Sequence, residues 1–292
     1  MKIRCFIISV FLLSVSVFVD TIPSLAQTQS PGDHIVKSEF NGKSYRLNVS
    51  LPKAYSISDS ARYPVLYVLD GKFSYQSFKS IREVLDLAHE IKEVIIVAIE
   101  SDGSNDADWF ASRYGDFTPS GIPQADTQWA KMMQIPVEKM KSGGASLFLS
   151  TLEKNLIPFI DLHYKTNGSR SISGHSLGGL FAGYCLVKKP ALFVNYGINS
   201  PSFWWNNNEM LLLEQTFAEQ NAGMSAHVFF SAGALEGDMM IGPLTALINS
   251  LKSHGYKGLR MNQQIFEGET HVSVVAACSS RALRVLFGAN LN

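Results

Sequence analysis

The chain has 292 residues, a length that suits one large α/β domain or two small ones. Its hydrophobic content of 46% with 17% charged residues is enough for a sizeable core and argues against disorder. Because 25 Lys and Arg balance 25 Asp and Glu, the charge gives no support for binding nucleic acid or an anionic membrane surface.

The N-terminus has the three parts of a secretory signal peptide. Residues 1–4 are basic, residues 5–19 form an apolar run, and Ser24 and Ala26 provide small residues at the −3 and −1 positions of a cleavage site. We expect cleavage after residue 26, a periplasmic or extracellular protein, and no stable membrane insertion. The alternative is an uncleaved anchor, although the run is shorter than the roughly 20 residues a spanning helix needs.

Residues 27–292 are expected to form a single α/β domain. Removal of the leader leaves two cysteines, Cys185 and Cys278. Both fall on expected buried helix faces, where a free cysteine behaves as a small hydrophobic residue. A disulfide between them stays an open alternative in an oxidising compartment.

The mature chain begins with a predicted hairpin. Residues 34–40 and 43–51 alternate in polarity on either side of Asn41-Gly42, the strongest short-range hairpin signal. Residues 65–69 then form a continuous apolar run, typical of a central strand covered on both faces, which ends at Asp70-Gly71. A helix over 73–90 and a buried strand over 94–99 should follow.

The segment 101–143 is rich in aromatic side chains, and we expect it to form one long, irregular connection. A connection of this length inside a compact domain is usually functional. We therefore predict a lid or a substrate-binding loop here. An amphipathic helix interrupted by Pro158 should span 145–164.

The segment Gly174-His175-Ser176-Leu177-Gly178 carries the pattern G-x-S-x-G. In a nucleophile elbow this pattern lies on a sharp turn between a strand and a helix, which exposes the serine oxygen. Residues 170–173 resemble a short strand, and residues 177–188 have helical apolar spacing. This context favours a nucleophilic Ser176 over a structural glycine turn.

Beyond the elbow, strands and helices continue to alternate. The expected strands are 192–198, 227–231 and 259–266, and the expected helices are 209–219, 243–254 and 273–286. This alternation predicts a mainly parallel sheet with helices on both faces, and in such sheets ligands bind at the carboxyl ends of the strands.

A serine hydroxyl needs an adjacent base, and a histidine in turn needs a carboxylate to orient it. In α/β-hydrolases the order is serine, acid, histidine. His271 is the histidine in the loop after the last strand, so it is the predicted base. Glu236 is the favoured acid, Asp238 is the alternative, and a simple Ser–His dyad stays possible.

Two backbone N–H groups should stabilise the tetrahedral oxyanion. The residue after the nucleophile, Leu177, is one predicted donor, and Gly71 in the loop after an earlier strand is the other. An ordinary turn is the alternative for Asp70-Gly71.

Arg113, Trp204 and Trp205 are the candidate substrate-binding residues. Arg113 could bind a substrate carboxylate or pin the long loop through an ion pair, and the second role is slightly favoured. Either tryptophan could stack on an aromatic or sugar substrate, and core packing of at least one is equally well supported. No metal-ligand spacing and no phosphate-binding loop is found, so we expect no metal and no cofactor.

Several segments, taken together, resemble the Putative esterase family of α/β-hydrolases. They are Leu66–Gly71, the Arg113-x-x-Asp116-Phe117-Thr118-Pro119 motif, the elbow, Ser200–Trp205, and the Glu236 and His271 segments. The family includes ferric-siderophore esterases, esterase D-like enzymes, feruloyl and acetyl-xylan esterases, and mycolyltransferases. The Leu-Asp-Gly, Ser-Pro-Ser-x-Trp-Trp and elbow segments are most similar to the siderophore esterases.

The resemblance implies a serine esterase acting on a small-molecule ester, with Ser176 and His271 in the central roles. A siderophore esterase would use basic residues for an anionic ferric ligand, and only Lys72, Arg113 and Lys79 are suitable here. Within the family, the alternatives are a ferric-siderophore esterase and a feruloyl or acetyl esterase. The further alternatives are an acyltransferase with the same triad and, last, a hydrolase-fold binding protein without turnover.

Overall fold

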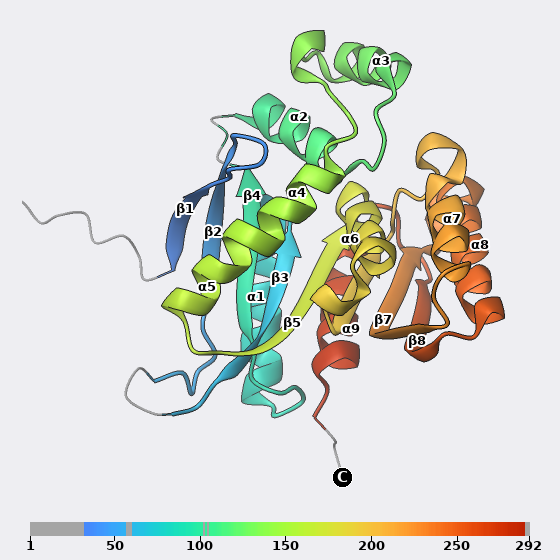
Figure 1. Cartoon of the computed structure of the whole chain (residues 1–292). Helices are drawn as coiled ribbons and strands as arrows, with labels where there is room; N and C mark the ends of the chain where they lie inside the picture. Colours follow the sequence, from blue (N-terminus) through green and yellow to red (C-terminus); the bar gives the residue numbers. More distant parts are fainter. Residues whose placement is uncertain (1–31, 57–59, 102, 104, 290–292) are drawn as a thin grey trace, which may run out of the picture.

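The computed structural model describes residues 32–56, 60–101, 103 and 105–289. Within these ranges one eight-stranded sheet runs through the molecule (Figure 1). In spatial order its strands are β1 (Asp33–Lys37), β2 (Ser44–Ser50), β4 (Ile95–Ser101), β3 (Tyr63–Leu69), β5 (Thr166–His175), β6 (Asn195–Asn199), β7 (Gly223–Gly233) and β8 (Lys257–Phe266). The strands from β4 to β8 are parallel, which confirms the predicted mainly parallel sheet.

The hairpin predicted at the N-terminus is also confirmed. β1 pairs antiparallel with β2, and β2 pairs antiparallel with β4, so the hairpin forms one edge of the sheet. Gly42 lies in the turn with a φ of 71°, a conformation that glycine adopts without steric cost.

Helices cover both faces of the sheet (Figure 1). One face carries α1 (Gly71–Leu87) and α9 (Val274–Phe287), which contact each other. The other face carries α4 (Ala145–Thr151), α5 (Ile157–His163), α6 (Leu177–Lys188), α7 (Trp205–Ala218) and α8 (Asp238–His254). A π-helical turn, Leu152–Leu156, joins α4 to α5 just before Pro158, at the predicted interruption.

The central strand β3 shows how the sequence creates two cores. Val65, Tyr67 and Leu69 belong to the larger apolar cluster, while Leu66 and Val68 belong to the smaller one on the opposite face. Successive side chains of a strand point to opposite faces, so a continuous apolar run is needed where both faces are covered. These five side chains are at most 1% exposed.

Residues 101–143, which we predicted to be irregular, contain two helices instead. α2 (Asp106–Phe117) and α3 (Pro123–Met133) lie above the carboxyl ends of the central strands in Figure 1. Asn105 caps α2 by accepting a hydrogen bond from the Asp108 N–H, and Pro123 starts α3. Both signals are present in the sequence, and the buried Tyr114 and Phe117 follow at helical spacing.

Within the described ranges, no helix combines the length and the apolar character that crossing a membrane requires. The predicted signal peptide, residues 1–26, lies outside the described residues.

Candidate active site

Ser176 lies on the turn between β5 and α6, at the carboxyl end of a central strand. Its backbone has φ 60° and ψ −120°, a region that non-glycine residues rarely adopt. A Cβ atom on Gly174 would lie 2.2 Å from the carbonyl oxygen of Gly178, so the two arms of the turn approach too closely for any side chain there. The motif therefore folds as the strand–turn–helix that a nucleophile elbow requires.

His271 follows β8 and reaches back across the sheet edge to Ser176. Its Nε2 atom lies 3.0 Å from Ser176 Oγ, and its Nδ1 atom lies 2.7 Å from Glu236 Oε2. The side chains of these three residues thus form one continuous hydrogen-bonded row, although they are 35 to 95 positions apart in the sequence.

Glu236 lies at the end of a short 3₁₀ turn, Ala234–Glu236, between β7 and α8. Its side chain is fully buried, and its Oε1 accepts hydrogen bonds from the Ser200 hydroxyl and the Gly233 N–H, both at 2.6 Å. Burial raises the pKa of Glu236, but the hydrogen bonds from His271, Ser200 and Gly233 outweigh it and leave the pKa below its ordinary value. The site therefore favours an ionised Glu236.

Asp238 occupies a different position from Glu236, although it is only two residues away. It is the first residue of α8 and is exposed to solvent. Of the two candidate acids, the structure brings Glu236 and not Asp238 onto the His271 ring.

The two predicted oxyanion donors occupy equivalent positions. Leu177 is the first residue of α6 and Gly71 is the first residue of α1. The first N–H groups of a helix have no partner within the helix, and its positive dipole end favours negative charge. Asp70 turns the chain into α1 with a φ of 57°, and a Cβ atom on Gly71 would lie only 3.2 Å from the backbone of β4.

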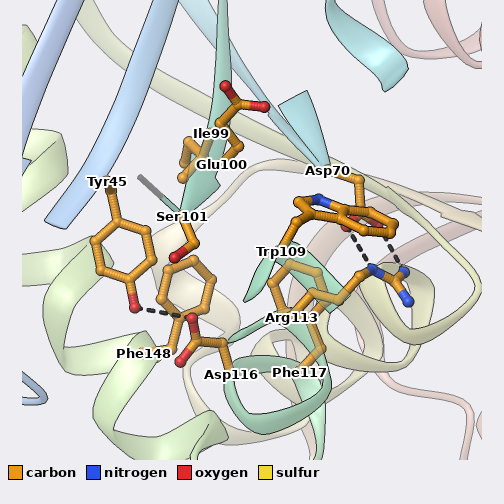
Figure 2. Close-up of a pocket in the computed structure, with 10 residues that line it drawn as sticks. All are labelled: Tyr45, Asp70, Ile99, Glu100, Ser101, Trp109, Arg113, Asp116, Phe117 and Phe148. Carbon is orange, nitrogen blue, oxygen red and sulfur yellow. Dashed lines mark hydrogen bonds and ion pairs between the residues drawn. The ribbon is translucent and has the colours of Figure 1, made fainter. Parts of the chain in front are cut away.

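Arg113 is mostly buried and forms an ion pair with Asp70, in the loop that carries Gly71. Its Nε and Nη2 atoms donate to the two carboxylate oxygens of Asp70 at 2.6 and 2.8 Å, as Figure 2 shows. The guanidinium also lies over the Trp109 ring, 5.1 Å from its centroid. The cavity beside this pair is only about 10 Å³, roughly the space for one water molecule.

Asp116, from the same sequence motif as Arg113, holds the N-terminal hairpin. It accepts hydrogen bonds from Lys43 Nζ at 2.7 Å and from the Tyr45 hydroxyl at 2.9 Å, the second of which is drawn in Figure 2. Burial raises the pKa of Asp116, an effect that the adjacent Lys43 opposes. The motif thus ties α2 to two other parts of the fold.

The two tryptophans lie beside the serine in different surroundings. Trp204 is partly exposed and donates through Nε1 to the sulfur of Met240, while Trp205 is 1% exposed and packs edge-on against Tyr114. Both line a small cavity that also includes Ser176. Trp205 is therefore a core side chain with one face on that cavity.

Three residues beside Ser176, His271 and Glu236 were given no role in our sequence interpretation. The His175 ring lies 4.5 Å from the His271 ring, centroid to centroid, and Ser202 Oγ is 3.4 Å from Ser176 Oγ. Ser200, with a positive φ of 41°, holds Glu236. Ser200 and Ser202 belong to the Ser-Pro-Ser segment after β6. This cluster of polar residues at a strand end was the sequence signal that could have indicated their place in the site.

Cys185 and Cys278 are both buried and free, which leaves the disulfide alternative without support in the structure. Burial raises the pKa of each thiol. Among the described residues, no group of three or more His, Cys, Asp or Glu side chains is arranged to hold a metal ion.

A mainly parallel sheet with helices on both faces, a serine elbow after a central strand and a histidine after the last strand together define an α/β-hydrolase. Residues 38–240 match the family described as "Putative esterase", and the chain belongs to this family. The predicted enzyme class, a carboxylic-ester hydrolase, is thereby confirmed.

Relatives match along almost the whole chain. The ferri-bacillibactin esterase BesA of Bacillus subtilis is 31% identical over 265 residues, which cover 87% of this chain and 89% of that protein. The siderophore triacetylfusarinine C esterase of Aspergillus fumigatus is 26% identical over 84% of this chain and 89% of that protein. The crystal structure of the BES protein from Bacillus cereus has 31% identity and a TM-score of 0.73, with 88% and 94% of the two chains covered.

Proposed function

We propose that this protein is a secreted serine esterase that hydrolyses carboxylic esters of small molecules through an acyl-serine intermediate. One observation carries the proposal: the hydrogen-bonded row of Ser176 Oγ, His271 Nε2 and Nδ1, and Glu236 Oε2, with distances of 3.0 and 2.7 Å. Nucleophile, base and orienting acid within hydrogen-bond reach are the geometric signature of an activated serine.

In the first half of the proposed reaction, Ser176 Oγ attacks the ester carbonyl carbon and its proton moves to His271 Nε2. Glu236 accepts the hydrogen bond from Nδ1–H and stabilises the imidazolium. The N–H groups of Leu177 and Gly71 donate to the oxyanion. When the tetrahedral intermediate collapses, the bond to the alcohol oxygen breaks and that oxygen takes the proton from Nε2.

The second half repeats these steps with water as the nucleophile. His271 Nε2 accepts a proton from water, the hydroxide oxygen attacks the acyl carbon, and Ser176 leaves with the proton returned from Nε2. If an alcohol replaces water at this stage, the same machinery acts as an acyltransferase. Product analysis with and without an added acceptor alcohol separates these two outcomes.

The nucleophile is tested with Ser176→Ala on nitrophenyl esters of increasing acyl length. We expect kcat to fall by about ten-thousandfold or more, because removing the nucleophile of a triad leaves only binding and oxyanion stabilisation. Equal activity in the variant would exclude Ser176 as the nucleophile. A wild-type protein that binds esters saturably without turnover would instead indicate a binding protein.

The acid is tested with a matched pair, Glu236→Gln and Asp238→Asn. Each change replaces a carboxylate by an amide of the same shape. We expect the first to lower kcat by about a hundredfold to ten-thousandfold and the second to stay within about twofold of wild type, since only Glu236 contacts His271. The reverse ranking would assign the acid to Asp238, and two small effects would favour a dyad.

Secretion is the part of the proposal that rests on residues 1–26. Expression of the full chain in a bacterium should yield a periplasmic or extracellular protein whose first residue is Gln27. N-terminal mass spectrometry of the cell fractions provides the measurement. A cytoplasmic product that begins at Met1 would contradict this localisation.

Siderophore esters are a second candidate substrate, favoured by the names of the relatives. The Bacillus subtilis relative is a ferri-bacillibactin esterase, and the Aspergillus fumigatus relative is a siderophore esterase. The cations predicted for an anionic ferric ligand are largely engaged, since Arg113 is paired with Asp70 and Lys72 with Asp106. Chromatographic assay of ferric and iron-free siderophores, with Ser176→Ala as the control, tests this candidate.

A further inference from the structure

Ser176 lies where two cavities of very different size meet. The large cavity, of about 670 Å³, extends between α1, α2 and α9 and is lined mainly by apolar side chains, among them Phe73, Trp109, Met133 and Val275. The small cavity, of about 80 Å³, is lined by aromatic side chains that include Trp129 and Trp204. Phe110 and Arg113 border both cavities and form the wall between them.

The proposed reaction breaks the ester bond at Ser176, between the two cavities. The alcohol part and the acyl part of the substrate must therefore lie on different sides of this point. His271 borders the large cavity and Leu177 borders the small one. The leaving alcohol must take its proton from His271 Nε2, so the alcohol oxygen has to lie on the side that His271 faces. The acyl carbon stays on Ser176 with its oxygen held by the N–H groups of Leu177 and Gly71. The acyl chain takes the remaining direction around this carbon, which is the small cavity beside Leu177.

We propose that the large cavity binds the alcohol part of the substrate and the small cavity binds the acyl part. The preferred substrates are then esters of short-chain acids with bulky, apolar alcohols. This inference rests on the proposed serine mechanism and adds to it the chemical class of both halves of the substrate.

The volumes set the expected limit on the acyl chain. A cavity of about 150 Å³ in a protein core holds a benzene molecule, so about 80 Å³ suits an acyl group of roughly two to four carbons. The large cavity, at about 670 Å³, falls within the range of roughly 300–1,000 Å³ that is common for small-molecule sites.

The charges around the large cavity favour an uncharged alcohol. Among its described lining residues Arg113 is the one Lys or Arg side chain, and both oxygens of Asp70 hold it. Lys72 lies above the Phe73 and Trp109 rings at the cavity rim and pairs with Asp106. Burial in this cavity stabilises an apolar substrate group. An anionic group would find Arg113 and Lys72 already paired with carboxylates.

Two substrate series test the assignment in the wild-type protein. In the first, the alcohol is 2-naphthylethanol and the acid is acetic, butyric or octanoic acid. In the second, the acid is acetic acid and the alcohol is ethanol or 2-naphthylethanol, two alkyl alcohols of similar acidity. We expect kcat/KM to fall at least tenfold from butyrate to octanoate and to rise at least tenfold from ethyl to naphthylethyl acetate.

Variants of the two cavities give the assignment a second readout. Trp204→Ala or Trp129→Ala should raise the octanoate-to-acetate ratio of kcat/KM at least tenfold by opening the small cavity. Val275→Phe or Met133→Trp should lower the naphthylethyl-to-ethyl ratio by a similar factor. A ratio of two kcat/KM values measured with the same variant does not depend on how much of that variant is folded. Two variants are used for each cavity in case one of them does not fold.

The outcomes separate this inference from the function on which it rests. Preference for long acyl groups with small alcohols, or small-cavity variants that change alcohol rather than acyl selectivity, would overturn the cavity assignment while leaving the esterase proposal intact. Absence of hydrolysis with every ester, or equal rates in Ser176→Ala, would overturn the esterase proposal itself.

Discussion

At the scale of single residues, the site depends on backbone conformations that side chains normally avoid. Ser176, Asp70 and Ser200 all have positive φ, and each lies at the carboxyl end of a strand or directly after it. Such conformations cost of order 1–3 kcal/mol each and persist only where the surrounding structure enforces them. Here the enforcement comes from close backbone packing, which leaves no space for a side chain at Gly174.

We predict that Gly174→Ala disrupts the elbow, because its Cβ atom would lie 2.2 Å from the Gly178 carbonyl oxygen. Esterase kcat should fall at least a hundredfold, and the melting temperature should fall as well. Gly242→Ala is the matched control, since a Cβ atom there meets nothing within 4 Å and lies in α8. The control should keep wild-type kcat, and no gain in stability is expected, because Pro243 disfavours a side chain on the helical residue before it.

Rate assays and thermal unfolding of both glycine variants provide the measurement. If Gly174→Ala keeps wild-type kcat, then the elbow tolerates a side chain and its strain does not position Ser176.

At the scale of elements, α2 connects otherwise separate parts of the molecule. Arg113 binds Asp70 in front of α1, and Asp116 binds Lys43 and Tyr45 of the hairpin region. The helix also contributes to the wall between the two cavities through Phe110. An irregular loop would lose more conformational entropy in holding these contacts, whereas a helix presents them from one rigid face.

We predict that Arg113→Met costs about 2–3 kcal/mol of unfolding free energy, since Arg113 and Asp70 are only 11% and 13% exposed and the change leaves Asp70 without its partner. Arg284→Met breaks an Arg–Glu pair with Glu90 whose side chains are 44% and 33% exposed, so it should cost less than about 1 kcal/mol. Arg113→Met should also lower kcat, because Asp70 precedes the proposed oxyanion donor Gly71.

Urea unfolding and steady-state kinetics of the two arginine variants provide the comparison. Equal losses of stability in both would show that the Arg113–Asp70 pair behaves as an ordinary surface pair.

At the scale of the whole molecule, the parallel sheet gathers residues that are distant in sequence at one edge. Ser176, Glu236 and His271 follow β5, β7 and β8, and the carboxyl ends of these strands point the same way. The same gathering places the partly buried His175 beside His271, with its Nε2 atom enclosed and without a hydrogen-bond partner among the described residues. Burial and the neighbouring His271 lower the pKa of His175 to about 4.

We predict that this histidine makes the protein acid-sensitive. The unfolded chain takes up a proton at His175 near pH 6.5 and the folded protein only near pH 4, so the unfolded state binds more protons between these values. Stability should therefore fall as the pH drops from about 6.5 to 4, by up to roughly 3 kcal/mol from this group, and no further below. Asp70, Arg113 and Glu236 also act on the His175 charge.

His175→Phe keeps a ring against His271 and removes the titration, so its stability should fall less over the same window. His89→Asn is the control and should follow the wild-type profile, because His89 is exposed and its positive φ suits asparagine. Urea unfolding at several pH values between 4 and 7 provides the measurement. Parallel profiles for wild type and His175→Phe would exclude His175 as the source of acid sensitivity.

The sequence by itself determined the order of the strands, the helices outside residues 101–143, the central strand and the position of the elbow. These depend on local patterns: the apolar run of Val65–Leu69, the Asn41-Gly42 turn, and glycines where the chain turns sharply. It also singled out Ser176 and His271, because chain order and position after a strand restrict where such residues can lie. The structure brings their side chains to 3.0 Å.

Only the tertiary structure decided which carboxylate contacts His271, what Arg113 binds, and how the space around Ser176 is divided. Glu236 and Asp238 have nearly the same place in the sequence, but Glu236 ends a 3₁₀ turn with its side chain buried, whereas Asp238 is the exposed first residue of α8. Arg113 and Asp70 are 43 residues apart, and the cavities lie between side chains of several elements. Such contacts depend on distances across the fold, which local spacing along the chain does not encode.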